Sequence, residues 1–180
     1  RKSFTEWCRF RGFEPARHHQ LLITELEAVA RGENKKLALF LPPGSAKSTY
    51  GSILFPPWFL GRNPKMSVIG ASHAGELAER FGRRFRNLVG SGEFKRIFGF
   101  GLSGDNAAAG RWETEHGGEY YAVGVDASVT GRRADLGIID DAVKGRAEAD
   151  SETIRQRTWD WYKADFWPRL KPGGRVVVIA

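Results

Sequence analysis

The sequence predicts an α/β fold of three layers, in which helices cover both faces of a mostly parallel central sheet. Short continuous apolar runs have the pattern of strands buried on both faces, and stretches of helical periodicity separate them. Strands that alternate with helices are typical of βαβ units, which place their strands parallel to one another. The apolar runs are Leu37–Leu41, Met66–Ala71, Leu136–Ile139 and Arg175–Ile179.

The composition indicates a globular chain with a basic surface. Its 180 residues suffice for one domain with a sizeable core, and 41% hydrophobic and 27% charged residues are ordinary for such a domain. The net charge of +7 comes mostly from arginine and favours an acidic partner such as nucleic acid; a generally basic, soluble surface is the alternative. Cys8 is the only cysteine, and no apolar run approaches the roughly 20 residues that span a bilayer. We therefore expect no disulfide, no membrane partner and an intracellular setting.

The first 33 residues predict two helices. Aromatic residues recur every three positions from Phe4 to Phe13, and we expect residues 1–16 to form a helical appendage of the domain. Arg17–Arg31 carries an apolar stripe at helical spacing, and Gly32 is placed to end that helix. His18 and His19 are adjacent and diverge on a helix, so we expect no metal site there.

The stretch Leu37–Thr49 predicts a strand that runs into a phosphate-binding loop. A Pro-Pro-Gly turn follows the strand, and Lys-Ser-Thr comes next, where a helix can open. Loop N–H groups and the positive helix end would hold an anion, with Lys47 on the β- and γ-phosphates and the Ser48 hydroxyl on Mg²⁺. The standard pattern has glycine where Leu41 and Ala46 stand, so a buried strand ending in a proline turn is the alternative.

Further along the chain, periodicity predicts a helix over Gly75–Leu88 with its arginines outward. These arginines, Arg80, Arg83, Arg84 and Arg86, form either a DNA-facing stripe or a solvated face. We expect Thr49–Phe55 to be a short helix that Pro56-Pro57 stops. Residues 90–110 read as irregular, residues 111–123 as a β-hairpin, residues 125–134 as a loop and residues 151–170 as an aromatic-rich helix.

Polar residues follow three of the predicted strands: the phosphate loop, Ser72-His73 and Asp140-Asp141. Carboxyl ends of parallel strands share one edge of a sheet, so these segments should converge there. Asp140 ends an apolar strand, which is where enzymes with a phosphate loop place the acid that orients Mg²⁺; Asp141 would polarise the attacking water. Two adjacent acids could instead cap a helix.

Four segments, in order along the chain, together resemble the ATPase domain of a tailed-phage terminase large subunit. They are Gln20, Leu-Pro-Pro-Gly-Ser-Ala-Lys-Ser-Thr (41–49), Val-Ile-Gly-Ala-Ser-His (68–73) and Gly-Arg-Arg-Ala-Asp-Leu-Gly-Ile-Ile-Asp-Asp (131–141). The resemblance implies a P-loop NTPase of the additional-strand type that hydrolyses ATP with Mg²⁺ and drives double-stranded DNA into a capsid. It also implies a homo-oligomeric ring at the portal protein, a small terminase subunit as partner, and action in the cytoplasm of a bacterial host.

The resemblance implies roles for individual residues as well. Lys47 and Asp141 would be catalytic, Ser48 and Asp140 would hold Mg²⁺, and Arg132 or Arg133 would reach the ATP of a neighbouring subunit. The nucleotide would be bound by Arg17, Gln20, Pro43, Gly44, Ser45, Ala46, Lys47, Ser48 and Thr49. Many relatives have glutamate where Asp141 stands and carry an arginine inside the loop, which is absent from Leu37–Thr49 here.

By the same resemblance, residues 1–180 are the ATPase domain of a longer protein, and the coupling motif and the nuclease domain would follow residue 180. The isolated fragment is then expected to be mostly monomeric. Three alternatives are open: a helicase-like remodeller, a P-loop kinase or nucleotide switch, and a domain that binds DNA without hydrolysis. For Arg132 and Arg133 the alternative is contact with DNA alone or pairing with Asp135.

Overall fold

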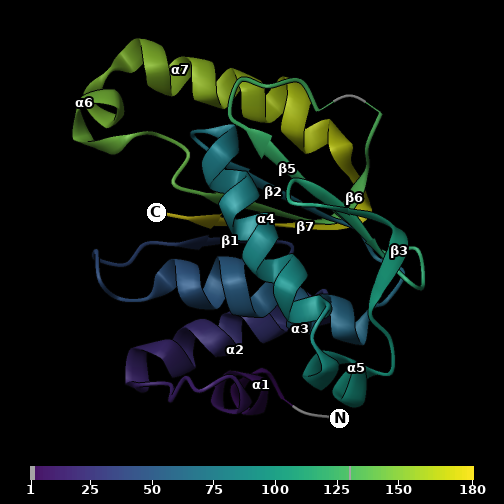
Figure 1. Cartoon of the computed structure of the whole chain (residues 1–180). Helices are drawn as coiled ribbons and strands as arrows, with labels where there is room; N and C mark the ends of the chain where they lie inside the picture. The colour runs from purple at the N-terminus through teal and green to yellow at the C-terminus, as the bar shows by residue number, and fades with distance from the viewer. Residues whose placement is uncertain (1–2, 130) are drawn as a thin grey trace.

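The computed structural model describes residues 3–129 and 131–180, and in this part of the chain seven strands form one sheet (Figure 1). The strand order is β1-β7-β6-β2-β5-β4-β3. The first five strands in this order run parallel, and β4 and β3 are antiparallel additions at one edge. The strands are β1 Lys36–Leu39, β2 Val68–Ser72, β3 Leu102–Ala108, β4 Arg111–Thr114, β5 Glu119–Gly124, β6 Ala134–Asp140 and β7 Leu170–Ile179.

Helices cover both faces of the sheet, as the sequence predicts. One face packs on α1 (Phe4–Phe10), α2 (Arg17–Arg31), the π-helix η1 (Thr49–Leu54), α3 (Phe55–Arg62), α4 (Gly75–Val89) and α5 (Gly92–Phe98). The other face packs on α7 (Glu152–Trp161) and the π-helical turn η2 (Tyr162–Phe166), which run on into a 3₁₀ turn, η3 (Trp167–Arg169). Figure 1 shows α7 above the sheet and α1 to α3 below it. No helix among the described residues is long and apolar enough to cross a membrane.

Alternation along β6 shows why the layers form. Leu136 and Ile138 join the apolar cluster of α1 to α5, and Ile139 joins the cluster of α7. Successive side chains of a strand point to opposite faces, so a continuous apolar run suits a strand covered on both sides. The prediction of such strands is confirmed for β2 and β6, which are buried along nearly their whole length.

For β1 the prediction of burial on both faces is wrong. β1 is an edge strand that pairs with β7 alone, and Ala38 and Phe40 are exposed. An apolar run records hydrophobicity and cannot tell whether a second layer reaches that part of the sheet. β7 lies between β1 and β6, and it is the inserted strand that the additional-strand type implies.

Two further predictions about single elements are wrong. Pro56 and Pro57 do not stop a helix: they lie in the first turn of α3, which continues directly from η1. The φ that a proline ring fixes, about −65°, is a helical one. Residues 90–110 are not irregular, since they contain α5 and β3. Ser91 caps α5 by accepting from the Phe94 N–H, and Gly99 ends it with φ +86°. A short helix, α6 (Gly145–Asp150), was not predicted at all.

Candidate nucleotide-binding site

The carboxyl edge of the sheet brings together the loop after β1, the end of β2 and the end of β6. The Ser48 hydroxyl lies 3.1 Å from Asp140 Oδ1, and the Ser72 hydroxyl donates to the Asp140 carbonyl oxygen at 2.7 Å. The His73 N–H donates to the Asp141 carbonyl oxygen at 2.9 Å. The predicted convergence of the three polar segments is therefore present, at the end of the sheet where the C-terminus lies in Figure 1.

The loop between β1 and η1 has the backbone of an anion-binding turn. Gly44 has φ +81° and Ala46 has φ +57°, so two residues out of three are left-handed. Such turns gather consecutive N–H groups into a concavity, and the first N–H groups of the helix that follows lack intrahelical partners. The left-handed conformation costs a residue with a Cβ roughly 1–2 kcal/mol, so Ala46 is strained where glycine would not be.

Two observations fit a phosphate group in this loop. The Ser45 hydroxyl oxygen is buried and has no hydrogen-bond partner among the described residues. A Cβ added at Gly44 would meet nothing within 4 Å, so the loop is open on that side. Pro43 and Gly44 are exposed, and Lys47, Ser48 and Thr49 are half-buried at the helix start. The loop can receive a polar anion without moving core side chains.

Asp140 is buried, with 1% of its surface exposed, and among the described residues its carboxylate accepts only from hydroxyl groups. Ser48 donates to Oδ1 and Ser52 donates to Oδ2 at 2.5 Å. Burial raises the pKa of Asp140, the hydrogen bonds from Ser52 and Ser48 oppose that rise, and the neighbouring Asp141 adds to it. No Lys or Arg of the described chain forms an ion pair with it. A carboxylate oxygen beside a serine hydroxyl is a donor set that suits Mg²⁺.

Ser52 is a functional candidate that sequence reasoning missed. It lies four residues after Ser48 on the same helical segment, so both hydroxyls reach the two oxygens of Asp140. The spacing of the two serines is visible in the sequence, but its partner lies 88 residues away. Only the pairing of β1, β7 and β6 places that partner beside the helix.

Asp141 is held by its backbone and exposes its side chain. It has φ +51°, its N–H donates to the Ile179 carbonyl oxygen at 3.0 Å, and its own carbonyl oxygen accepts from His73. Strained backbone persists where surrounding contacts determine it, and here two neighbouring strands supply those contacts. The exposed carboxylate can accept a proton from a water molecule at the open edge of the sheet.

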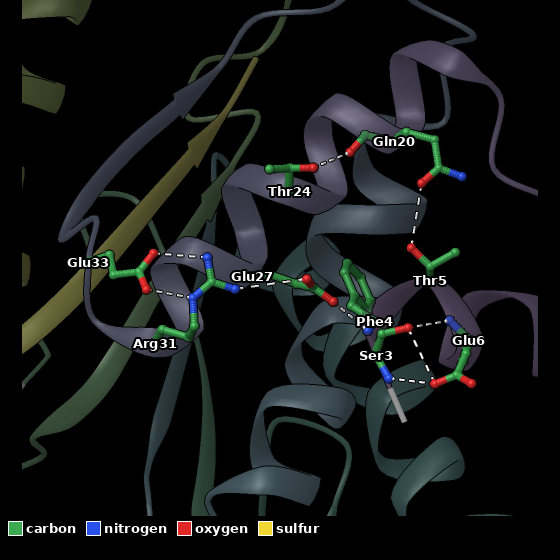
Figure 2. A network of polar contacts seen from close by, with 9 residues as sticks. All are labelled: Ser3, Phe4, Thr5, Glu6, Gln20, Thr24, Glu27, Arg31 and Glu33. Carbon is green, nitrogen blue, oxygen red and sulfur yellow. Dashed lines mark hydrogen bonds and ion pairs between the residues drawn. The ribbon is translucent and has the colours of Figure 1, made fainter. Parts of the chain in front are cut away.

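Arg17 and Gln20, the two residues expected to contact the adenine base, are placed differently from each other. Arg17 is exposed at the start of α2. Gln20 turns towards α1, where its Oε1 lies 3.5 Å from the Thr5 hydroxyl and its Nε2 lies 3.4 Å from the Pro15 carbonyl oxygen; Figure 2 shows the first of these contacts. The residue of this segment that touches the phosphate loop is His19, whose Nε2 lies 3.0 Å from the Ser45 carbonyl oxygen. Among the described residues, no group of three or more His, Cys, Asp or Glu side chains is placed to hold a metal ion.

Arg132 and Arg133 lie at the start of β6, at the opposite end of the strand from Asp140. Seven residues at about 3.3 Å each separate the two ends of the strand by roughly 20 Å. Arg132 Nη1 pairs with Glu119 Oε2 at 3.1 Å, and Arg133 is exposed. The alternative that these arginines pair with Asp135 is wrong, since Asp135 pairs with Lys171. Neither arginine belongs to the site of its own chain.

The order of strands, the loop after β1 and the acid that ends β6 define this protein as a P-loop NTPase by fold. Residues 39–166 match the family described as terminase large subunit, T4likevirus-type, N-terminal, and the chain belongs to this family. It is 27% identical over 150 residues to the terminase large subunit of Enterobacteria phage T3, covering 81% of this chain and 25% of that protein. The chain therefore spans about a quarter of the length of that relative.

Two solved structures share the fold. The ATPase domain of a Thermus phage large terminase superposes with a TM-score of 0.61 at 16% identity, covering 97% of this chain and 68% of that one. The large terminase of bacteriophage HK97 superposes with a TM-score of 0.54 at 14% identity, covering 93% of this chain and 34% of that one. At these identities the likeness shows the fold alone.

Proposed function

We propose that this chain is the ATP-hydrolysing motor domain of a viral DNA-packaging terminase, with ATP and Mg²⁺ bound at the carboxyl edge of the sheet. The observation that carries the proposal is the contact between Ser48, next to Lys47 in the phosphate loop, and the buried Asp140. A loop lysine, a helix-start serine and a strand-end acid are the parts that phosphoryl transfer needs in one place. The names of the relatives agree: one is a large terminase and one is an ATPase domain.

Each residue has a role that its position supports. In the loop from Pro43 to Thr49, backbone N–H groups after Pro43 bind the phosphates, and Lys47 neutralises their charge. Pro43 itself has no N–H, and the Ser45 N–H already donates to the Pro42 carbonyl oxygen. Ser48 and Asp140 would hold Mg²⁺, which would neutralise phosphate charge during transfer. Asp141 orients the attacking water and accepts its proton. Arg17 and Gln20, both at the start of α2, are proposed to contact the adenine base.

The test is ATP hydrolysis by the purified chain, with and without double-stranded DNA. We expect Mg²⁺-dependent release of phosphate that double-stranded DNA accelerates. Hydrolysis that ignores DNA favours the P-loop kinase or switch, and displacement of one DNA strand favours the helicase-like remodeller. ATP binding with no hydrolysis under any of these conditions contradicts the motor function and leaves a nucleotide-binding domain.

Contact with DNA is proposed through the phosphate backbone. The net charge is +7, and Arg80, Arg83 and Arg84 are exposed along α4. Arginine contacts to phosphates release counterions, so log affinity should fall with log salt at a slope of roughly −0.9 per phosphate neutralised, with little dependence on base sequence. Affinity that does not change between low and physiological salt contradicts this mode of binding.

Arg132 and Arg133 are proposed to act on the ATP of a neighbouring subunit in a ring at the portal protein, in the bacterial cytoplasm and with a small terminase subunit as partner. Their distance from Asp140 of the same chain supports action in trans, since a head-to-tail ring places one end of a subunit against the other end of its neighbour. Such an arginine contributes about 10³–10⁵-fold to turnover in other P-loop enzymes.

A mixing experiment tests the trans role. An Asp141→Asn subunit is combined with an Arg132→Ala/Arg133→Ala subunit under assembling conditions. Each is expected to be inactive alone, and the mixture is expected to recover turnover at interfaces that join an intact acid to intact arginines. No recovery, when sedimentation shows that the subunits assemble, contradicts action across the interface.

A further inference from the structure

His19 joins the start of α2 to the phosphate loop through both of its ring nitrogens. Nδ1 lies 3.1 Å from the backbone N of Ala16, and Nε2 lies 3.0 Å from the Ser45 carbonyl oxygen. A backbone N–H can only donate and a carbonyl oxygen can only accept, so the neutral ring must carry its proton on Nε2. The ring also stacks on Tyr50, with centroids 4.3 Å apart and planes 26° apart. Three contacts therefore fix its position and its tautomer.

The bond to Ser45 controls a peptide that the phosphate site depends on. In a planar trans peptide the carbonyl oxygen and the next N–H point in opposite directions. Holding the Ser45 carbonyl oxygen towards α2 therefore turns the Ala46 N–H away from α2. The residue on the far side of this peptide is Ala46, whose φ of +57° is a conformation that alanine does not favour on its own.

We propose that His19 is a positioning residue for the phosphate loop: its bond to Ser45 holds the strained turn at Ala46 in the shape that binds the phosphates of a nucleoside triphosphate. The inference rests on the nucleotide-binding function proposed above. It accounts for a loop that has alanine where the standard pattern has glycine. Glycine adopts a positive φ without support, and here a side chain from outside the loop supplies the support.

The experiment measures the equilibrium affinity of the 180-residue chain for ATP without Mg²⁺, so that the readout is binding and not turnover. His19→Phe keeps a ring against Tyr50 and removes both hydrogen bonds, and we expect ATP to bind about tenfold more weakly. His19→Gln keeps a donor for Ser45 and should stay within about threefold of the unsubstituted chain. His18→Phe is the matched control, because His18 is exposed and touches His19 only by its ring; it should leave the affinity unchanged.

Rescue by glycine separates positioning from a general structural role. Ala46→Gly added to His19→Phe should restore the affinity to within about threefold of that of Ala46→Gly alone, which is the reference for this rescue. Melting temperatures of all variants show which are folded. Should His19→Phe not fold, His19→Leu replaces it in the same comparison.

The ATP affinities of these variants distinguish a failure of the His19 role from a failure of the phosphate loop. Unchanged ATP affinity in His19→Phe, or a loss that Ala46→Gly does not restore, overturns the role of His19 and leaves the nucleotide site in place. An unsubstituted chain that does not bind ATP, or that binds it equally well after Lys47→Ala, overturns the phosphate loop itself and this inference with it. Loss in His19→Phe with rescue by Ala46→Gly supports the inference.

Discussion

Strand β6 carries an aspartate near each end, and the two carboxylates have different kinds of partner. At the amino end, Asp135 Oδ2 accepts the Ser67 N–H at 2.8 Å and pairs with Lys171 Nζ at 2.8 Å. At the carboxyl end, Asp140 is more deeply buried and is given only the hydroxyls of Ser48 and Ser52. Glu119, at the amino end of β5, likewise pairs with Arg132, whereas Asp141 has no ion pair within the described part of the chain.

The difference supports the proposal that Asp135 stabilises the fold and that Asp140 binds a ligand. A carboxylate that pairs with a cation and a backbone N–H is complete within the chain. A buried carboxylate without a cation lowers the stability of the protein, and proteins keep such groups where a bound ion will compensate for them. This contrast supports the proposal that the carboxyl edge of the sheet binds a cation, whereas Asp135 and Glu119 at the amino edge are already paired.

The largest effect on ATP turnover is expected at Lys47, the cation proposed to face the phosphates. Lys47→Ala should abolish ATP turnover and leave the fold intact, because no other described lysine or arginine lies in the loop from Phe40 to Ser48. The control is Lys65→Ala, which removes an exposed lysine before β2, at the amino edge. Phosphate release and circular dichroism are measured together. Full turnover in a folded Lys47→Ala protein shows that the phosphate loop has been assigned wrongly.

The proposed catalytic acid, Asp141, is expected to give the next largest effect. Asp141→Asn should bind ATP normally and lower turnover about 10²–10⁴-fold, since amide nitrogen and oxygen cannot take the proton of the attacking water. Single-turnover hydrolysis and ATP binding are measured on the same preparation. Turnover equal to that of the unsubstituted chain would show that another carboxylate is catalytic. Glu119 and Asp135 do not fit that role, because both lie at the amino edge of the sheet and both are paired.

Asp140→Asn tests whether the metal site lowers the stability of the free protein. Burial raises the pKa of Asp140, so the stability cost of its ionisation develops as the pH rises above the ordinary aspartate pKa. The cost is complete above the raised pKa and absent below the ordinary one. The neutral amide avoids the cost. We expect the melting temperature without Mg²⁺ to rise by at least about 2 °C at pH 8, and the gain to shrink as the pH falls towards 4.

The same variant should bind Mg²⁺ poorly, and its turnover should require more of the ion. Thermal melts with and without Mg²⁺ and ATP, followed over pH, provide both measurements. Most substitutions destabilise, so a rise is a discriminating result. A lower melting temperature at every pH would mean that Asp140 is stabilising as it stands, and the contrast with Asp135 would be lost.

The sequence predicted the parts that depend on local pattern. Arg17–Arg31 was predicted to be one helix and is α2 with these same bounds, because an apolar stripe and a terminal glycine are local signals. The convergence of the loop, Ser72-His73 and Asp140-Asp141 was also predictable, since it follows from parallel strands alone.

What the sequence could not show depends on which strand lies next to which. The exposure of β1 follows from its place at the sheet edge, and the contact of Ser52 with Asp140 follows from the same strand order. The contact of His19 with Ser45 joins residues 26 apart through a helix and a strand. Gln20, the next residue, is one of the four segments on which the resemblance to terminases rests. Its side chain faces α1 and not the phosphate loop (Figure 2).

The smallest effect is expected at the amino end of β6, and it completes the comparison. Asp135→Asn removes the charge that Lys171 pairs with, while the amide oxygen can still accept the Ser67 N–H. Lys171 is 37% exposed and Asp135 is 19% exposed, so solvent screens the pair and the expected loss of stability is only about 1 kcal/mol. For a chain of this size that corresponds to about 2–4 °C in melting temperature. Lys171→Met should give a similar loss, and the double variant should lose little more than either single one, because both remove the same interaction.

ATP turnover and its Mg²⁺ dependence should match those of the unsubstituted chain in all three variants. A fall in turnover without a fall in melting temperature would show that the amino edge takes part in the reaction of its own chain, and the division of β6 into a structural end and a ligand-binding end would then be wrong.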